Sequence, residues 1–269
     1  MHLTSPKWWR TGYPSRSVIV QLGSMSPPID NSRFRKIRLG IETIPSQFSL
    51  PRHRHLRAYA TVVLSGSFEE SGYNGRIKAA AGDVLIHSAL DCHGNRTVSA
   101  GVKVIRLDWT DDTGQGGLYR FEDVDELAIV AERDAIQAMH LLRRTLAEKG
   151  RPSRGKRNDW PDLLLADLAS DASIEIGAWA DLNGLARETV SRGFVAAYGV
   201  APSVLRAELR ARSAWLLITR GSERLCRIAA ETGFADQAHM TRWIHRITGA
   251  SPAVWRRNTS VAPAFRLAC

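Results

Sequence analysis

An internal repeat with a period of fifty residues constrains the fold of the C-terminal part of this 269-residue chain. Arg192 in the first copy corresponds to Arg242 in the second, and a Gly-x-x-Pro segment recurs in phase with them. A repeat of this kind predicts two copies of one supersecondary unit. The other matched positions are Ala180/Ala230, Val190/Met240, Phe194/Ile244, Gly199/Gly249, Pro202/Pro252, Val204/Val254 and Arg206/Arg256.

Each copy predicts a helix, a tight turn and a second helix. In the second copy, Gly233 stands where the turn needs a residue that tolerates left-handed backbone angles. The helix that follows is expected from about Asp236 to Thr248, and Gly249 ends it. Its inner face is predicted from apolar residues at i, i+3, i+4 and i+7, which are Met240, Trp243, Ile244 and Ile247.

The opposite face of each second helix points away from the core, because successive side chains turn by about 100°. Arg, Gln, Ser and Thr on such a face suit the reading of base edges in the major groove of double-stranded DNA. A single outward residue is more often a solvated surface residue, but Arg192 and Arg242 match in both copies. The candidate DNA-binding residues are Arg187, Glu188, Ser191 and Arg192 in the first copy and Gln237, Ala238, Thr241, Arg242 and His245 in the second.

Arginine dominates the charge of the repeat region. From Gly184 to the C-terminus the sequence has 13 Arg, 5 acidic residues and no Lys. The guanidinium group presents a planar fork of donors that suits phosphate and guanine. A genome that prefers Arg codons explains the missing Lys equally well. The net charge of the whole chain, +10, favours polyanionic partners but is a weaker indication.

The second copy also contains a long and specific motif, Ile228-Ala229-x-x-x-Gly233-Phe234-x-Asp236-Gln237-x-x-Met240-x-Arg242-Trp243-Ile244-x(4)-Gly249-x-Ser251-Pro252-x-x-Trp255-Arg256. This segment resembles the signature of the AraC/XylS transcription regulators. The first copy, with Arg192-Gly-Phe194 and Tyr198-Gly199-Val-Ala-Pro202, is similar to that family's first helix-turn-helix. The resemblance covers roughly residues 160–257. Ala186 departs from it, because a Ser is frequent at the start of the first recognition helix.

The N-terminal half predicts a β-structure. Ile37, Leu39 and Ile41 alternate with polar residues, and Asn74-Gly75 is typical of a hairpin turn. Many short strands separated by turns favour a sandwich or barrel. The family resemblance implies a cupin-like barrel that binds an effector. His53-Arg-His55 and the segment from Gly82 to His93 resemble the two cupin motifs. The predicted fold class is therefore α+β, with an N-terminal cupin-like β-barrel followed by an all-α domain with two helix-turn-helix units.

The barrel histidines leave alternatives open. A small-molecule effector is expected near His53, His55, Tyr59, His93 and Trp109, and the alternative is that these residues only pack the barrel. His53, His55 and His93 are also suited to a three-histidine metal site. Enzymatic cupins add a Glu four or five residues after the second His, where this chain has Tyr59 and Ala60. No metal ligand, cofactor or catalytic residue is therefore assigned. A metal-binding cupin enzyme or sensor, with a helical half that serves protein interaction, is the alternative function.

Segment boundaries follow from changes in composition. An apolar stripe from Val124 to Leu146 predicts one helix that serves dimerisation or packs on its own barrel. The segments are an irregular arm (1–30), the barrel (31–110), the helical segment (111–149), a linker (150–158), the DNA-binding domain (159–258) and a tail (259–269).

Partners and location are expectations of the same kind. The expected partners are double-stranded DNA, a small-molecule effector and a second copy of the chain, with RNA polymerase as a further candidate. Cys92, Cys226 and Cys269 form no disulfide pattern, which fits a reducing cytoplasm. The sequence shows no signal-like apolar run and no stretch long enough to span a membrane, so no membrane partner is expected.

Overall fold

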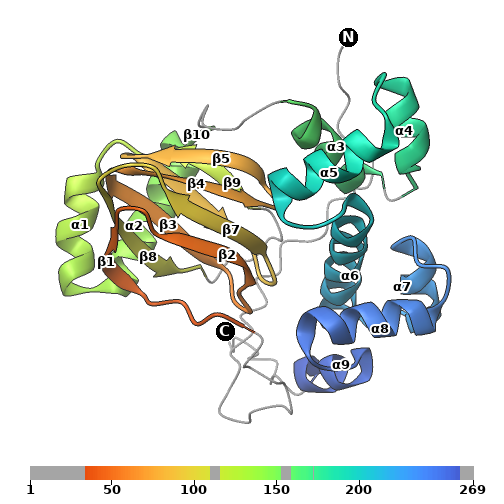
Figure 1. The fold of residues 1–269 in the computed structure, drawn as a ribbon. Helices are drawn as coiled ribbons and strands as arrows, with labels where there is room; N and C mark the ends of the chain where they lie inside the picture. The colour runs from red at the N-terminus through yellow and green to blue at the C-terminus, as the bar shows by residue number, and fades with distance from the viewer. Residues whose placement is uncertain (1–33, 110–115, 153–158, 172, 261–269) are drawn as a thin grey trace. The chain divides into compact units, whose positions relative to one another are not determined.

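The computed structural model of the chain describes residues 34–109, 116–152, 159–171 and 173–260 (Figure 1). The described residues separate into two compact units. One unit combines the described residues between 34 and 165 with residues 186–202, and the other contains the described residues between 166 and 185 and residues 203–260. The predicted N-terminal arm, most of the predicted linker and most of the predicted tail lie outside the described residues.

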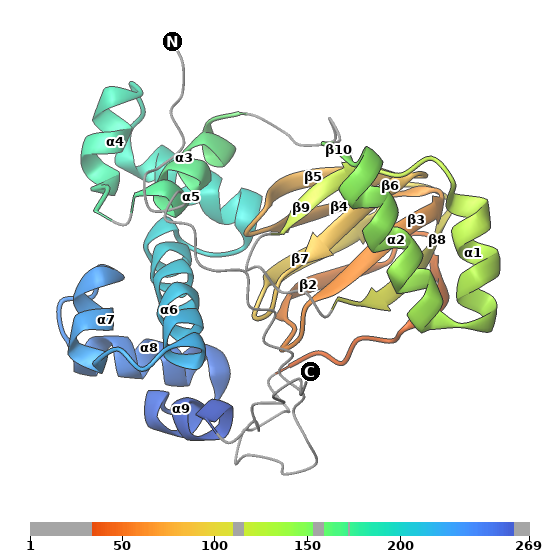
Figure 2. The same ribbon diagram turned by 180° about the vertical axis from the view of Figure 1, so that it is seen from behind.

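The first unit contains two antiparallel sheets that face each other (Figures 1 and 2). One sheet has the strand order β1-β8-β3-β6-β9-β10, and the other has the order β2-β7-β4-β5. This architecture confirms the predicted β-domain. The strands are β1 (Gly40–Pro45), β2 (Ser49–Arg54), β3 (Tyr59–Ser65), β4 (Ser67–Gly72), β5 (Gly75–Ala80), β6 (Asp83–His87), β7 (Cys92–Thr97), β8 (Gly101–Asp108), β9 (Gly117–Arg120) and β10 (Arg151–Pro152).

The six-stranded sheet is buried on both faces. Val62 and Val63 are neighbours on β3 and therefore point to opposite faces, and both are fully buried. Val62 belongs to a cluster with α1 (Val124–Arg133) and α2 (Ala135–Lys149), which cover the outer face of the sheet (Figure 2). Val63 belongs to the core between the two sheets. Alternate residues of the strand therefore face either the two helices or the core between the sheets.

The predicted single helix over residues 124–146 is wrong in one respect, because Asp134 divides it. This residue has extended backbone angles, and its side chain accepts hydrogen bonds from the amides of Ile136 and Gln137, so it caps α2. Met139 and Leu142 of the predicted stripe pack on the barrel, together with Leu127 and Ala138. The outward Ile129 and Ile136 remain exposed, and dimerisation through these helices stays a prediction.

Two short strands lie in segments that the sequence assigns to helix or linker. β9 pairs with β6 and places Leu118 opposite Leu85, and β10 pairs with β9. Strands of four and two residues are too short to show an alternation of apolar and polar residues in the sequence. Only the pairing seen in the structure places them in the sheet. The strand expected from Ile37 begins only at Gly40, and Leu39 is 51% exposed.

The C-terminal part of the chain is helical, as predicted. No described helix is long and apolar enough to cross a membrane. The helices are α3 (Trp160–Ser170), α4 (Ile176–Leu182), α5 (Arg187–Tyr198), α6 (Pro202–Arg220), α7 (Leu225–Glu231), α8 (Gln237–Thr248) and α9 (Pro252–Ser260).

The repeat has a one-residue shift that the sequence comparison missed. Ala180 is fully buried and its carbonyl accepts from the amide of Leu185, while the same hydrogen bond in the second copy runs from Phe234 to Ala229. The matched residue in the first helix is therefore Ala229, and Ala230 is exposed. The second copy has one extra residue in its turn, so the fifty-residue period applies only from the second helix onward.

Gly66 is expected to be the least replaceable turn glycine of the sheets. Gly66 and Gly75 both have positive φ, at 76° and 98°. A Cβ at Gly66 would overlap the carbonyl oxygen of Gly101, whereas a Cβ at Gly75 would meet nothing within 4 Å. We expect Gly75→Ala to lower the free energy of unfolding by about 1–2 kcal/mol through backbone strain. Gly66→Ala should cost clearly more in urea unfolding, and equal losses would contradict the close approach.

Candidate functional site

The second helix-turn-helix unit has a buried face and an outward face. Met240, Ile244 and Ile247 of α8 are buried, as the spacing predicts. Four of the five candidate residues on α8, Gln237, Ala238, Arg242 and His245, are exposed, and Thr241 is half-buried. Trp243 is half-buried rather than inside, with its indole N–H donating to His239 and the guanidinium of Arg246 above its ring. The structure therefore leaves an exposed and mostly polar face along the helix.

Helix α5 of the first copy has the same two-sided character. Val190, Phe194 and Tyr198 are buried along one side. All four candidate residues, Arg187, Glu188, Ser191 and Arg192, are exposed. Val195 interrupts the polar face and is 43% exposed. Each of α5 and α8 is followed by a glycine with left-handed angles, Gly199 and Gly249, so both helices end in the same way.

The starts of these two helices differ. The carboxylate of Asp236 accepts a hydrogen bond of 2.6 Å from the amide of His239, which caps α8. Ala186 stands at the corresponding place before α5 and has no side chain that could accept from the first turn. The first turn of α5 therefore lacks the stabilisation that a polar cap gives.

The two caps predict opposite mutational effects. Asp236→Ala should lower the free energy of unfolding by about 0.5–2 kcal/mol, because the amide of His239 loses its acceptor. Ala186→Ser should raise it by a similar amount, since a hydroxyl can accept from the first turn of α5. Urea unfolding of the purified variants measures both changes. A stabilised Asp236→Ala protein would contradict the assigned cap.

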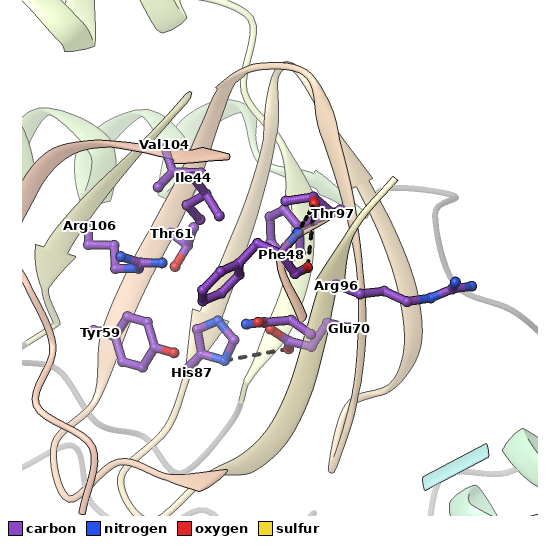
Figure 3. Close-up of a pocket in the computed structure, with 12 residues that line it drawn as sticks. Ile44, Phe48, Tyr59, Thr61, Glu70, His87, Arg96, Thr97, Val104 and Arg106 are labelled. Atoms are coloured by element: carbon purple, nitrogen blue, oxygen red, sulfur yellow. Dashed lines mark hydrogen bonds and ion pairs between the residues drawn. The ribbon is translucent and has the colours of Figure 1, made fainter. Parts of the chain in front are cut away.

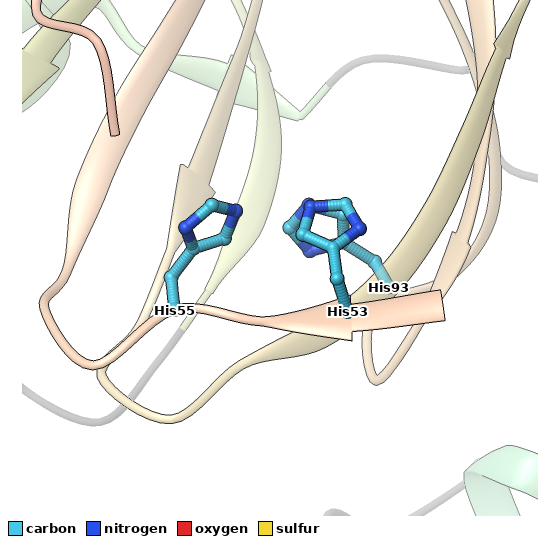
Figure 4. Close-up of side chains that lie close together, drawn as sticks. All are labelled: His53, His55 and His93. Atoms are coloured by element: carbon cyan, nitrogen blue, oxygen red, sulfur yellow. The ribbon is translucent and has the colours of Figure 1, made fainter. Parts of the chain in front are cut away.

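The second group of candidate residues lies inside the β-unit. His53 on β2 is directly opposite His93 on β7 in the register of the four-stranded sheet, and His55 follows the end of β2. The ring centroid of His53 lies 4.8 Å from that of His55 and 4.7 Å from that of His93 (Figure 4). Tyr59 joins them, with its hydroxyl 3.2 Å from Nε2 of His93. The structure thus brings together four of the five residues expected near an effector.

Trp109 is the exception. Its indole packs with the cluster under α1 and α2, and the guanidinium of Arg143 on α2 lies 5.7 Å from the ring centroid. It continues the parity of Ile105 and Leu107, which also belong to the helix-covered face. Alternation along β8 was the signal that could have placed Trp109 away from the histidines.

Three buried residues of the same interior were not assigned by the sequence analysis. His87 on β6 pairs with Tyr59 in the sheet, and its Nδ1 lies 3.1 Å from the Asp91 carboxylate. Glu70 on β4 is 3% exposed. Alternation with Phe68 could have placed Glu70 inside, but its distance from the histidines depends on pairings that the sequence does not show.

A cavity lies between the sheets next to this cluster (Figure 3). Ile44 and Val104 lie toward one end of it, while Tyr59 and His87 lie toward the other. Arg106 lines the wall and forms an ion pair with Glu42 on β1. The cavity therefore combines an apolar wall with polar side chains. The remaining lining residues are Phe48, Thr61, Phe68, Glu70, Asn95, Arg96 and Thr97.

Burial controls the protonation of the cluster. Burial and the neighbouring His93 lower the pKa of His53 to about 4 and that of His55 to about 3. Burial raises the pKa of Glu70 to about 7 and that of Tyr59 well above its usual value. Burial alone would also raise the pKa of Asp91, but the His87 and His93 imidazoles hold it well below its usual range. The imidazoles of His53 and His55 are therefore neutral at pH 7.

The neutral histidines predict that the metal-free protein loses stability in acid. An unfolded His has a pKa of about 6.5, so below that pH the unfolded state binds more protons than the native state. For His55 alone, lowering the pH from about 7 to about 5 should reduce the free energy of unfolding by up to about 2 kcal/mol. In urea unfolding, His55→Gln should show a smaller pH dependence, while His140→Gln, on the exposed side of α2, should keep that of the wild type. Equal slopes in all three proteins would contradict the depressed pKa.

The three-histidine group satisfies the chemical demands of a metal site. Nδ1 of His53 lies 2.9 Å from the carbonyl oxygen of Pro51, and Nδ1 of His55 lies 2.7 Å from that of Arg35. A carbonyl can only accept, so each Nδ1 donates and Nε2 keeps the lone pair. One ligand atom of each of His53, His55 and His93 lies within 4.8 Å of the other two. The arrangement of these residues is compatible with a metal ion, and a metal site here remains an alternative interpretation.

Comparison with known proteins identifies the C-terminal part of the chain. Residues 179–258 match the model of a family described as a helix-turn-helix domain. This match spans α5, α8 and the helices between them. Comparison with curated protein sequences gives no match.

Several solved structures show a distant similarity. ToxT from Vibrio cholerae strain SCE256, solved with bound unsaturated fatty acid, has 12% identity and a TM-score of 0.39, with 86% of this chain and 100% of that chain covered. The C-terminal domain of AraT, a response regulator from Geobacillus stearothermophilus, has 17% identity and a TM-score of 0.34, covering 39% and 86%. The xylose-binding transcription activator XylR has 15% identity and a TM-score of 0.33, covering 46% and 38%. These TM-scores are too low to establish a shared overall fold.

Proposed function

Because residues 179–258 form an AraC-type helix-turn-helix domain, we propose that the chain is a sequence-specific transcription regulator that reads double-stranded DNA with α5 and α8. The observation that supports this function most directly is the matched outward faces of the two helices. Arg192 and Arg242 occupy equivalent positions in the repeat, and both are exposed on the side opposite a buried apolar face. A purely structural repeat would not need an exposed arginine at the same place in both copies.

The chemistry of the two faces fits the reading of bases. Arg can donate two parallel hydrogen bonds to O6 and N7 of guanine, and Gln can pair with adenine in the same groove. Arg192, Gln237 and Arg242 would make such contacts in this proposal. The remaining candidates, Arg187, Glu188, Ser191, Ala238, Thr241 and His245, would contact neighbouring bases or the phosphate backbone.

The length of α6 is compatible with two successive readings of the duplex. This helix has 19 residues. At about 1.5 Å per residue it is about 28 Å long, somewhat shorter than the DNA pitch of about 34 Å. Recognition helices that precede and follow a connector of this length in the chain could therefore enter successive major-groove segments of the DNA. The operator in this proposal contains two short boxes about one helical turn apart.

The interior of the β-unit is proposed to bind the effector. The cavity beside Tyr59 and His87 combines an apolar wall with a few polar groups, as ligand sites do, and its volume of about 20 Å³ admits only a very small ligand without rearrangement. Occupation of this site would change the affinity of the helical part for DNA. A second copy of the chain and RNA polymerase are further partners in this proposal.

Replacement of either outward arginine tests the DNA-binding proposal. Arg192→Ala and Arg242→Ala should each weaken binding to the preferred duplex by about 1–3 kcal/mol, or about 5- to 150-fold, because a base contact is lost. Arg133→Ala removes the same charge from an exposed position on α1 and serves as the matched control. Selection of duplexes from a random pool, followed by affinity measurements, reports both specificity and strength.

The outcomes separate DNA reading from other uses of the helices. Loss of one box with each arginine variant supports the proposed reading. Binding that is equally strong in both variants removes these residues from the reading face. A protein-interaction module would bind no duplex selectively. Any affinity of such a module for DNA would be independent of sequence and would fall steeply as the salt concentration rises.

A further inference from the structure

A second set of metal-ligand side chains lies deeper in the barrel than the three-histidine group. Glu70 on β4, His87 on β6 and His93 on β7 each offer one ligand atom within 4.8 Å of the other two. All three side chains are at most 3% exposed. His93 belongs to both groups, so His53 and His55 define an outer set and Glu70 and His87 an inner set.

The separations of the inner set are close to those of bound ligands. The carboxylate oxygens of Glu70 lie 3.7 Å from Nδ1 of His87 and 3.9 Å from Nε2 of His93, beyond hydrogen-bond distance. Two ligand atoms about 2.1 Å from a tetrahedral ion are about 3.4 Å apart. For these two pairs, shifts of a few tenths of an ångström reach this separation. The ion would replace the proton between Nδ1 of His87 and the Asp91 carboxylate, which lie 3.1 Å apart.

The tautomer of His93 points its lone pair toward Glu70. The hydroxyl of Tyr59 lies 3.2 Å from Nε2 of His93, while Nδ1 of the same ring faces the Asp91 carboxylate at 3.8 Å. A proton on Nδ1, on the side of that carboxylate, leaves Nε2 with its lone pair as an acceptor. The same nitrogen lies nearest the Glu70 carboxylate, where an ion could replace the phenol proton as its partner.

Two buried carboxylates lie beside the imidazoles of the inner set. Asp91 is buried beside His87 and His93, with Oδ2 at 3.1 Å and 3.8 Å from their Nδ1 atoms. Glu70 and Asp91 together carry two negative charges when ionised, and the nearby imidazoles are neutral ligands in their basic form. A divalent cation would balance both charges, and a buried carboxylate is costly without such a partner.

From these observations we propose that Glu70, His87 and His93 form a buried binding site for a divalent transition-metal ion such as Zn²⁺, Co²⁺ or Ni²⁺. Two imidazoles and a carboxylate are a ligand set that these ions accept, and Asp91 lies close enough to add a second carboxylate. The carboxylate that the outer His-x-His strand lacks is thus supplied by a different strand. As an extension that rests on the proposed DNA-binding function, this ion is the effector.

The test uses the purified full-length chain after removal of metal with a chelator. Co²⁺ is titrated and followed by its visible absorption, and Zn²⁺ binding is measured by equilibrium dialysis. The wild type should bind one ion per chain. Glu70→Gln and His87→Gln should weaken this affinity by at least about 10–100-fold, because each removes a ligand.

Matched controls lie on the same elements. Glu69→Gln changes the neighbouring carboxylate on β4, which pairs with Arg96 outside the barrel, and should leave the affinity unchanged. His140→Gln changes an exposed histidine and should do the same. His53→Gln separates the two sets, because it removes an outer ligand and leaves the inner set intact. If Glu70→Gln unfolds, Glu70→Asp keeps the charge, shifts the carboxylate and should bind with intermediate affinity.

Each outcome decides the proposal. Loss of binding in Glu70→Gln and His87→Gln with retained binding in His53→Gln supports the inner site. Loss in His53→Gln alone, or a wild type that binds no ion, overturns it.

DNA affinity is measured separately on a selected duplex with and without Zn²⁺, and a change of about 5- to 150-fold supports the effector role. Metal binding without such a change overturns the effector role only. If the protein binds no duplex selectively under any condition, the proposed function is overturned and the metal result still stands.

Discussion

Burial of both faces of the six-stranded sheet is the constraint on which the β-unit depends. Side chains on one face of this sheet pack against α1 and α2, and those on the other face pack against the four-stranded sheet. A polar residue at an inner position has no route to bulk water and must find its partners within the barrel. Tyr59, Glu70, His87 and His93 are in this position. They gather because β3 pairs with β6 in one sheet and β4 pairs with β7 in the facing sheet.

The same constraint gives the cluster its chemistry. Imidazoles that would otherwise titrate near neutral pH are held neutral at His53 and His55, while the Glu70 carboxyl titrates near neutrality instead of in acid. The polar groups are therefore ordered by packing before any ligand arrives. Preorganisation of this kind lowers the cost of binding, since little side-chain freedom remains to be lost.

The sequence predicted the parts of the fold whose signals are local. Helical periodicity and the glycines after α5 and α8 mark the two repeated units, and alternation marks the longer strands. The break at Asp134 and the strand β9 were missed, because a single capping residue and a four-residue strand leave no periodic signal. In the candidate site, His53 and His55 could be grouped from their spacing. Glu70 could not, since its neighbours come from strand pairings between residues far apart in the sequence.

The two candidate reading helices differ in what their first turns bring to a partner. Asp236 already occupies the amide donors at the start of α8, whereas the start of α5 after Ala186 has no side-chain acceptor. Free amides at a helix start attract anions, and an oxygen of the DNA backbone is such an anion. On DNA, the nucleic acid itself would complete the first turn of α5. The first turn of α5 would then gain its cap as it docks, whereas that of α8 is capped beforehand.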